Sequence, residues 1–299
     1  MTDSSPEFHG AAASAAADLP IATASEKSRK SRAGRPLGRA TIVGVTMLVV
    51  VGVCLLLPPL VFTSVVALLL VVGIWEVRAA FAEGGTTLPF GALLLAAVVL
   101  PLVAWSQGPE GLVAAFLCAV PIVLLGRLMR GGQERARDAI AAVLVLLWLP
   151  LLGSFLVLLD RPTDGSARVA TVILLTAASD TGGYLVGAWL GRHPMAPRVS
   201  PKKSWEGFVG SVLLCLIIGA LCGEFLLKAG WQTGLLLAVV AVIAATMGDL
   251  AESLIKRDLG VKDMGRLLPG HGGLLDRVDS LLVAAPAVWV ALAVVFPPS

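Results

Sequence analysis

The chain has 299 residues, of which 57% are hydrophobic and only 14% are charged. Average soluble domains carry about 25% charged residues, so this composition excludes an ordinary water-soluble globular protein. The formal net charge of +3 is small, and the mean hydropathy of +0.88 indicates a protein for which lipid is part of the solvent. We therefore expect an all-α, polytopic integral membrane protein.

The first 39 residues are rich in alanine and serine and then become basic, without a recognisable cleavable signal peptide. Such a composition is typical of a disordered tail. Its basic cluster is expected to keep the N-terminus in the cytoplasm, although anionic lipid headgroups would also attract it. The basic residues of the tail are Lys27, Arg29, Lys30, Arg32, Arg35 and Arg39.

A membrane-spanning helix needs about 20 mostly apolar residues, and nine stretches of the chain meet this requirement. They run over residues 40–58, 60–80, 88–105, 111–128, 138–159, 168–190, 207–227, 232–254 and 277–297. With a cytoplasmic N-terminus, twenty of the 23 Lys and Arg residues fall on the cytoplasmic side. Because basic residues favour that side, we predict about nine helices with the C-terminus on the opposite side.

The first half of the chain carries few groups suited to chemistry. Glu76 and Arg78 follow Trp75 near a predicted helix end, and we interpret them as an interfacial anchor pair. The four cysteines lie in apolar stretches without metal-ligand spacing, so they are expected to pack as small apolar side chains. They are Cys54, Cys118, Cys215 and Cys222.

The sixth predicted span carries an acid, Asp180, within the run 179–184. Ionisable groups inside membrane segments cost free energy and indicate a functional site; the alternative is a hydrogen bond to a neighbouring helix. Gly183 and Gly187 are four residues apart, a spacing that predicts the close approach of another helix backbone.

A polar loop, residues 198–207, precedes the seventh predicted span. The Ser-Pro pair at Ser200 ends any helix there, and Lys202 and Lys203 stand just before the next one. Ser204 could cap that helix, and the positive end of the helix dipole beside two lysines predicts a phosphate site. The alternative is that these lysines only set the topology.

The eighth predicted span ends in a polar segment. Asp249, Glu252, Ser253 and Lys256 stand at offsets that place all four on one helix face. A polar face on an apolar membrane helix must look toward a cavity or toward other helices, because lipid cannot satisfy it.

Residues 261–273 are rich in glycine and contain one histidine, His271. Glycines let backbone N–H groups approach a phosphate closely. The last predicted span then opens with Asp276 and Asp279, which share a face. Together with Asp249 they are candidate ligands for Mg²⁺, which proteins hold with one or two carboxylates plus substrate phosphates. The alternative is charge pairing with neighbouring Arg and Lys side chains.

These residues predict a membrane-embedded site open to the cytoplasm, with acids for a metal ion and lysines for phosphates. This equipment is typical of phosphoryl or nucleotidyl transfer, where positioning and charge stabilisation carry most of the catalysis. Buried acids also mark ion paths, so a membrane transporter is the rival class. We see no inverted repeat, and the charges cluster at one membrane face, which argues against a transporter.

A run of 27 residues resembles the signature of the phosphatidate cytidylyltransferases, also called CDP-diacylglycerol synthases. It contains Ser253, Lys256, Arg257, Lys262, Asp263, Pro269, Gly270, His271, Gly272, Gly273, Asp276, Arg277 and Asp279. Residues 200–207 and 179–184 resemble two further motifs of the family, with Ser204 where many members have threonine. The resemblance is strong over residues 170–282. It implies a catalytic transmembrane region, 161–299, after the N-terminal helices of 40–160.

The resemblance implies transfer of the cytidylyl group of CTP to phosphatidate, giving CDP-diacylglycerol and pyrophosphate for phospholipid biosynthesis. The site would face the cytoplasm in the inner or plasma membrane and use Mg²⁺, with a second, monovalent cation left open. Phosphatidate, CTP and the bilayer are the expected partners; a homodimer is left open, and no nucleic acid is expected. The nearest alternative is a CTP-dependent enzyme for another lipid, such as a polyprenol kinase.

The resemblance also assigns roles to individual residues. The metal-binding residues are Asp249, Asp276 and Asp279. The catalytic residues are Asp180, Lys202, Lys203, Ser204, Lys256, Lys262, His271 and Arg277. The substrate-binding residues are Ser200, Ser253, Gly270, Gly272 and Gly273.

Overall fold

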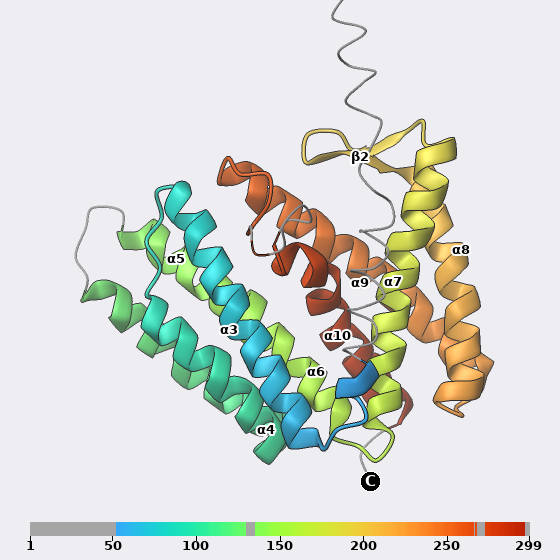
Figure 1. Ribbon diagram of the computed structural model, residues 1–299, viewed down its shortest axis with the longest axis horizontal. Helices are drawn as coiled ribbons and strands as arrows, with labels where there is room; N and C mark the ends of the chain where they lie inside the picture. Colours follow the sequence, from blue (N-terminus) through green and yellow to red (C-terminus); the bar gives the residue numbers. More distant parts are fainter. Residues whose placement is uncertain (1–51, 130–134, 266, 268–272, 297–299) are drawn as a thin grey trace, which may run out of the picture. The chain divides into compact units, whose positions relative to one another are not determined.

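The computed structural model describes residues 52–129, 135–265, 267 and 273–296. The predicted tail and most of the first predicted span lie outside the described residues, as do Gly270, His271 and Gly272. Within the described part, the chain is helical apart from one short hairpin, and seven helices are long and apolar enough to cross a membrane (Figure 1). The expected all-α class and multi-pass membrane character are confirmed.

With the two π-helical turns counted as parts of their helices, the outer bounds of the helices lie within four residues of the predicted spans. They are α3 (Pro59–Glu83), α4 (Phe90–Leu128), α5 (Arg135–Leu146), α6 (Leu152–Asp160), α7 (Gly165–Leu190), α8 (Trp205–Leu221), α9 (Trp231–Asp258) and α10 (Leu275–Val295). Two π-helical turns, η1 (Leu147–Leu151) and η2 (Cys222–Leu226), join α5 to α6 and extend α8. At η1 the cause is Pro150, which has no N–H to donate to the ladder and widens the turn.

Helix α4 is folded back on itself. A straight helix of 39 residues would be about 58 Å long, almost twice the hydrocarbon thickness of a bilayer. The helical conformation breaks at Gly108, with φ 80° and ψ −158°. A Cβ atom at Gly126 would lie 3.4 Å from Cβ of Pro89, so the two ends of α4 are neighbours. Helix α4 therefore consists of two helical segments, which correspond to the stretches predicted over 88–105 and 111–128.

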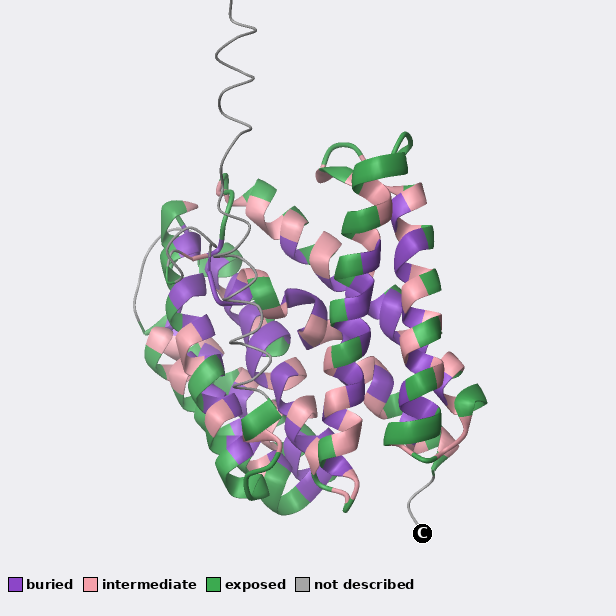
Figure 2. Cartoon of the chain, turned by 45° about the vertical axis from the view of Figure 1, so that its right-hand side comes forward, coloured by how far each residue is buried: buried purple, intermediate pink, exposed green. Residues whose placement is uncertain are grey.

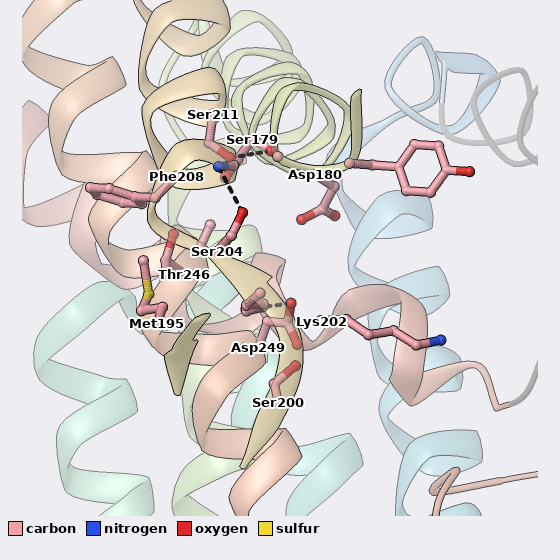
Figure 3. A pocket seen from close by; sticks show the side chains of 15 residues that line it. Ser179, Asp180, Met195, Ser200, Lys202, Ser204, Phe208, Ser211, Thr246 and Asp249 are labelled. Carbon is pink, nitrogen blue, oxygen red and sulfur yellow. Dashed lines mark hydrogen bonds and ion pairs between the residues drawn. The ribbon is translucent and has the colours of Figure 1, made fainter. Parts of the chain in front are cut away.

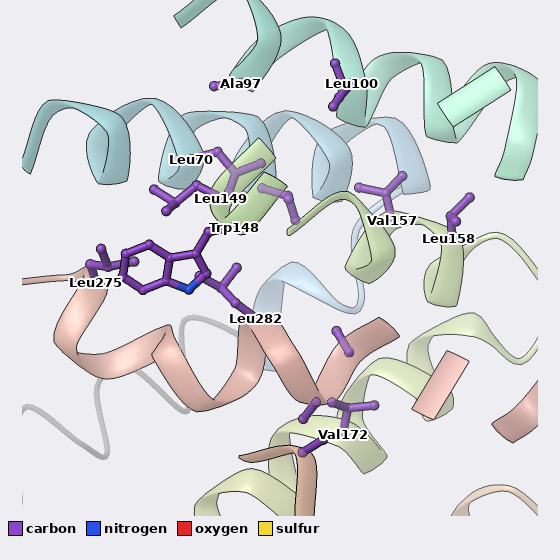
Figure 4. Close-up of a cluster of buried hydrophobic side chains, with 14 of the residues drawn as sticks. Leu70, Ala97, Leu100, Trp148, Leu149, Val157, Leu158, Val172, Leu275 and Leu282 are labelled. Atoms are coloured by element: carbon purple, nitrogen blue, oxygen red, sulfur yellow. The ribbon is translucent and has the colours of Figure 1, made fainter. Parts of the chain in front are cut away.

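The buried apolar side chains form one cluster that joins the first helices to the last (Figure 4). In Figure 2 the buried residues line the inside of the bundle, and the exposed ones cover the faces that lipid would contact. The labelled members of the cluster are Leu70, Ala97, Leu100, Trp148, Leu149, Val157, Leu158, Val172, Leu275 and Leu282.

Helices α7 and α8 pack backbone against backbone, and this contact builds one wall of the site. A Cβ atom at Gly182 would lie 2.5 Å from the carbonyl oxygen of Gly210, so only glycine fits. The hydroxyl of Ser211 donates to the carbonyl of Ser179 at 2.6 Å. The close approach predicted from the glycine spacing is confirmed, because Gly183 also faces Ser211. The partner helix belongs to the same chain.

A two-stranded antiparallel hairpin connects α7 to α8. Its strands are β1 (Pro194–Ala196) and β2 (Ser200–Ser204), with Pro194 opposite Ser204. The sequence predicted only a loop here. Figure 1 shows the hairpin at the same end of the bundle as the C-terminal end of α9. The side chain of Arg257 on α9 donates to the carbonyl of Val199 at 3.2 Å and ties the hairpin tip to that helix.

Candidate active site

A cavity of about 310 Å³ lies between α7, α8, α9 and the hairpin (Figure 3). Six of the residues predicted to belong to the site line it. They are Asp180, Ser200, Lys202, Lys203, Ser204 and Asp249. Serine and threonine hydroxyls from Ser179, Ser211 and Thr246 complete its polar wall. Residues separated by up to 70 positions in the sequence thus line one cavity.

The hairpin is held at its base by Glu206, the second residue of α8. One carboxylate oxygen accepts from the backbone N–H groups of Arg192 and His193 at 3.1 and 3.2 Å. The other oxygen lies 2.5 Å from Nδ1 of His193. Ser204 caps α8, as predicted, by accepting from the N–H of Gly207 at 3.1 Å. These contacts fix where strand β2 presents its two lysines.

The two lysines of β2 have different surroundings. Nζ of Lys203 lies 2.5 Å from Oδ2 of Asp249, so this ion pair bridges the hairpin and α9 across the cavity. Lys202 is exposed, and in Figure 3 its side chain extends away from Asp249. The other oxygen of Asp249 receives only a long contact, 3.4 Å, from the hydroxyl of Ser253. Lys203 is therefore engaged within the protein, while Lys202 is presented to incoming groups.

Three acids from three helices interact near the cavity, and two of them, Asp180 and Asp249, line it. Asp180 of α7, Asp249 of α9 and Asp279 of α10 interact electrostatically with one another. Lys203 and the exposed Arg277 supply positive charge to Asp180. The sequence predicted that Asp279 shares a helix face with Asp276, and Asp279 also interacts with Asp180 and Asp249. Like charges held close together repel, so such a group favours a bound cation.

Asp276 belongs to a neighbouring network on α9 and α10. Nζ of Lys256 lies 2.8 Å from Oε2 of the fully buried Glu252 and 2.9 Å from Oδ1 of Asp276. The carboxylate of Asp276 also accepts from the backbone N–H groups of Met264 at 3.2 Å and Gly273 at 2.8 Å. Asp276 thus holds the backbone of Met264 and Gly273 against the start of α10.

Other predicted residues lie apart from the cavity or outside the described residues. Lys262 lines a separate hollow beside the C-terminal half of α3. Gly270, His271 and Gly272 are not among the described residues. The interpretation of Glu76 as an interfacial anchor is wrong. Its side chain is 1% exposed, and it accepts from the backbone N–H groups of Leu274 and Leu275.

The acids fit a divalent cation to different degrees. Among the described residues, no three His, Cys, Asp or Glu side chains converge on one metal position. Mg²⁺ needs only one or two carboxylates when substrate phosphates and water supply the remaining ligands. Asp249 fits, because it lines the cavity and, among the described residues, its Oδ1 receives only a long hydroxyl contact. Asp276 would first have to exchange the hydrogen bonds that now occupy both oxygens.

Comparison with known proteins identifies the family of the chain. The model of the cytidylyltransferase family matches residues 39–295. A phosphatidate cytidylyltransferase of Mycobacterium bovis is 40% identical over 276 residues, covering 88% of this chain and 90% of the relative. That of Mycobacterium leprae is 39% identical over 278 residues, covering 87% and 89%. The match to the enzyme of Synechocystis, 41% identical, covers 50% of this chain and 53% of the relative. The chain therefore belongs to the cytidylyltransferase family.

Proposed function

We propose that the chain is a phosphatidate cytidylyltransferase, which transfers the cytidylyl group of CTP to phosphatidate. The products are CDP-diacylglycerol and pyrophosphate. Relatives of that name match nearly the whole chain at about 40% identity. The observation that carries the proposal is the cavity, where an exposed lysine and a lysine paired with an acid stand beside a capped helix N-terminus.

The reaction needs little covalent help from the protein. A phosphate oxygen of phosphatidate attacks the α-phosphorus of CTP. The new P–O bond forms as the bond to the oxygen bridging the α- and β-phosphates breaks, and pyrophosphate leaves with that electron pair. A phosphate monoester has a second pKa of about 6, so the nucleophile is already largely ionised at neutral pH. The protein must mainly neutralise the triphosphate and hold the two substrates in line.

The side chains of the hairpin suit the binding of the triphosphate. Lys202 is exposed at the cavity and supplies an uncommitted positive charge. The ion pair with Asp249 fixes the position of the Lys203 ammonium group, which stabilises negative charge on the triphosphate. Ser200 and Ser204 add hydroxyl groups beside the N-terminus of α8, where the helix dipole favours an anion.

Mg²⁺ is the proposed cofactor; when bound, it neutralises triphosphate oxygens and stabilises the charge that develops on the leaving group. Asp249 is the residue best placed to hold it. Asp180 and Asp279 interact electrostatically with Asp249 and support the same site. Asp276 is the second proposed ligand, and its participation requires Lys256 to exchange that carboxylate for another partner.

The remaining predicted roles are part of the same proposal. Lys256 and Lys262 neutralise phosphates, and Arg277 orients Asp276 or binds phosphate. Ser253 binds substrate, and its hydroxyl also makes a long contact with Asp249. His271 and the glycines at 270, 272 and 273 contact the triphosphate or the leaving pyrophosphate.

The proposal includes nine spans, a cytoplasmic N-terminus and a site facing the cytoplasm. The described helices, with α4 folded as a hairpin, account for all spans after the first. Arg161 and Lys228 stand in the α6–α7 and α8–α9 connections, which Figure 1 draws at the end of the bundle opposite β2. Few basic residues at that end favour its placement away from the cytoplasm. Gly183 and Gly187 pack within the chain, so a homodimer would need another surface.

The proposal is tested with purified protein in detergent micelles, phosphatidate, radiolabelled CTP and Mg²⁺. Label should enter the lipid phase as an equal amount of pyrophosphate is released, and EDTA should stop both. Replacing phosphatidate with a polyprenol distinguishes the nearest alternative enzyme. Label or phosphate transfer only to the polyprenol, or ion flux in liposomes without CTP consumption, would contradict the proposal.

A further inference from the structure

A glutamate in the first half of the chain reaches the start of α10. Glu76 lies on α3, and its side chain is 1% exposed. Oε1 accepts from the N–H of Leu274 and Oε2 from the N–H of Leu275, each at 3.0 Å. Leu274 is the N-cap residue of α10 and supplies no side-chain cap of its own. Glu76 therefore caps α10 from a helix that lies 198 residues earlier in the chain.

Two glycines of the signature segment make room for this carboxylate. The three heavy atoms nearest to a Cβ atom placed at Gly265 all belong to Glu76, the farthest of them at 2.8 Å. A Cβ atom at Gly273 would lie 2.8 Å from Oε2 of Glu76. Real Cβ contacts are longer than this, so a larger residue at either position would displace the carboxylate or the backbone. Glu76 is thus enclosed by the backbone of the segments that precede α10.

The contact is chemically consistent with an ionised carboxylate. A buried charge is tolerated when hydrogen bonds compensate it. The first N–H groups of a helix have no intrahelical partner, and the helix dipole favours a negative charge at that end. Glu76 meets both requirements with two charge-assisted hydrogen bonds.

Asp276 also holds the two backbone stretches that enclose Glu76. The carboxylate of Asp276 accepts from the N–H groups of Met264 and Gly273 and pairs with Lys256. Two acids, one from α3 and one from α10, therefore fix the backbone at residues 264–265 and 273–275. Neither Met264 nor Gly273 can shift without stretching a hydrogen bond to Asp276 or moving against Glu76.

We infer that Glu76 is a positioning residue for cytidylyl transfer, which sets the position of Asp276 and of the backbone at Gly265 and Gly273 beside it. The inference rests on the proposed function and extends the site to a helix outside the signature segment. Glu76 acts through the backbone, because its nearly buried carboxylate accepts hydrogen bonds from backbone N–H groups. Its removal should therefore lower kcat and increase the Mg²⁺ concentration needed for half-maximal rate, with little change in KM for phosphatidate.

The first test compares Glu76→Gln with Glu110→Gln in the full-length protein in micelles. Gln has the same shape, but its amide NH₂ would face a backbone N–H of α10 and one hydrogen bond would be lost. We expect kcat per folded molecule to fall about tenfold, as hydrogen bonds to charged groups predict. The Mg²⁺ requirement should increase with it. Glu110 is exposed on α4, so its variant should match the wild type in both measurements.

The second test uses Gly265→Ala alone and combined with Glu76→Ala. Alone, the methyl group meets Glu76 and should also lower kcat about tenfold. In the Glu76→Ala background the colliding atoms are gone, so adding Gly265→Ala should cost less than twofold further. This non-additivity is a readout that general destabilisation would not give. Gly265→Ala also keeps the inference testable if Glu76→Gln does not fold.

The outcomes separate this inference from the proposed function. Wild-type protein without cytidylyl transfer would contradict the function itself. Active wild type with a Glu76→Gln variant of unchanged kcat would overturn only the positioning role. A loss of activity that matches the loss of folded protein would also overturn the positioning role. Independent, multiplicative effects of Gly265→Ala and Glu76→Ala on kcat would overturn it as well.

Discussion

Lys256 on α9 lies 2.9 Å from Asp276 on α10 and joins the two helices at the edge of the site. The same ammonium group lies 2.8 Å from the buried Glu252, one turn earlier on α9. One lysine thus balances two acids from two helices. Breaking a buried pair by removing one partner is costly, because the remaining charge has lost its compensation.

Lys256→Met should therefore both destabilise the protein and reduce its activity. We expect about 3 kcal/mol of lost stability, because two acids lose their common cation. Thermal unfolding in detergent measures this change. Lys228→Met, at an exposed position between α8 and α9, serves as the control and should unfold like the wild type. Equal unfolding temperatures for the two variants would contradict the role of Lys256.

Glu206→Gln should weaken nucleotide use without unfolding the bundle. Glu206 accepts from two backbone N–H groups and contacts His193, so it fixes the base of the hairpin that carries Lys202 and Lys203. We expect kcat/KM for CTP to fall about tenfold, since misplaced binding groups lose much of their contribution. The measurement is steady-state kinetics with varied CTP.

The matched control for the hairpin variant is Glu224→Gln. Glu224 also accepts a backbone N–H, that of Trp231 at 3.0 Å, but at the start of α9 and away from the cavity. It should leave kcat/KM for CTP unchanged. A similar loss in both variants would show that the effect of Glu206 does not depend on the hairpin.

Gly182→Ala should separate α7 from α8 and distort the cavity between them. The added methyl group would lie 2.5 Å from the carbonyl oxygen of Gly210. Overpacking of this kind costs about 1–3 kcal/mol. We expect lower thermal stability and at least tenfold lower activity. Gly91→Ala, where nothing lies within 4 Å of the new methyl group, should change neither measurement.

Asp138→Asn should destabilise the protein but leave the chemistry intact. Arg127 and Asp138 are 3% and 2% exposed and pair at 2.5 Å between α4 and α5. Loss of the charge on Asp138 should cost about 3 kcal/mol, because Arg127 stays buried. The kcat per folded molecule should equal that of the wild type. A reduced kcat in correctly folded protein would indicate an unforeseen link to the site.

The surface counterpart of this pair provides the control. Arg168 and Asp164 pair at 2.9 Å, but the side chain of Asp164 is 42% exposed. Exposed ion pairs contribute at most about 1 kcal/mol. Asp164→Asn should therefore shift the unfolding temperature much less than Asp138→Asn does.

Hydropathy was sufficient to predict the described helices. A chain segment in lipid must satisfy its backbone polar groups with its own hydrogen bonds, so an apolar stretch of sufficient length forms a helix. It even separated the two halves of α4, since Gly108 and Pro109 interrupt the apolar run there. The sequence did not reveal the β1–β2 hairpin, whose strands have three and five residues. Strands this short carry no hydrophobic alternation to detect.

The site was predictable where side chains stand close together in sequence. Ser204 was expected to cap α8, and its hydroxyl accepts from Gly207. The interaction of Asp279 with Asp180 and Asp249 depends on how α10 faces α7 and α9, which the spacing of residues in the sequence does not encode. Glu76 was missed because its partners are backbone N–H groups 198 and 199 residues away. No spacing of side chains encodes a contact with backbone.

The central claim is that the cavity lined by Asp180, Lys203 and Asp249 is the site of cytidylyl transfer. The most direct test measures label transfer from CTP to phosphatidate and pyrophosphate release together, for wild type, Asp249→Asn and Asp258→Asn. Asp258 is the exposed last residue of the same helix. We predict equal, EDTA-sensitive rates of both products for wild type and Asp258→Asn. For folded Asp249→Asn we predict a loss of at least about a hundredfold. Wild-type rates from Asp249→Asn would contradict the assignment of this cavity.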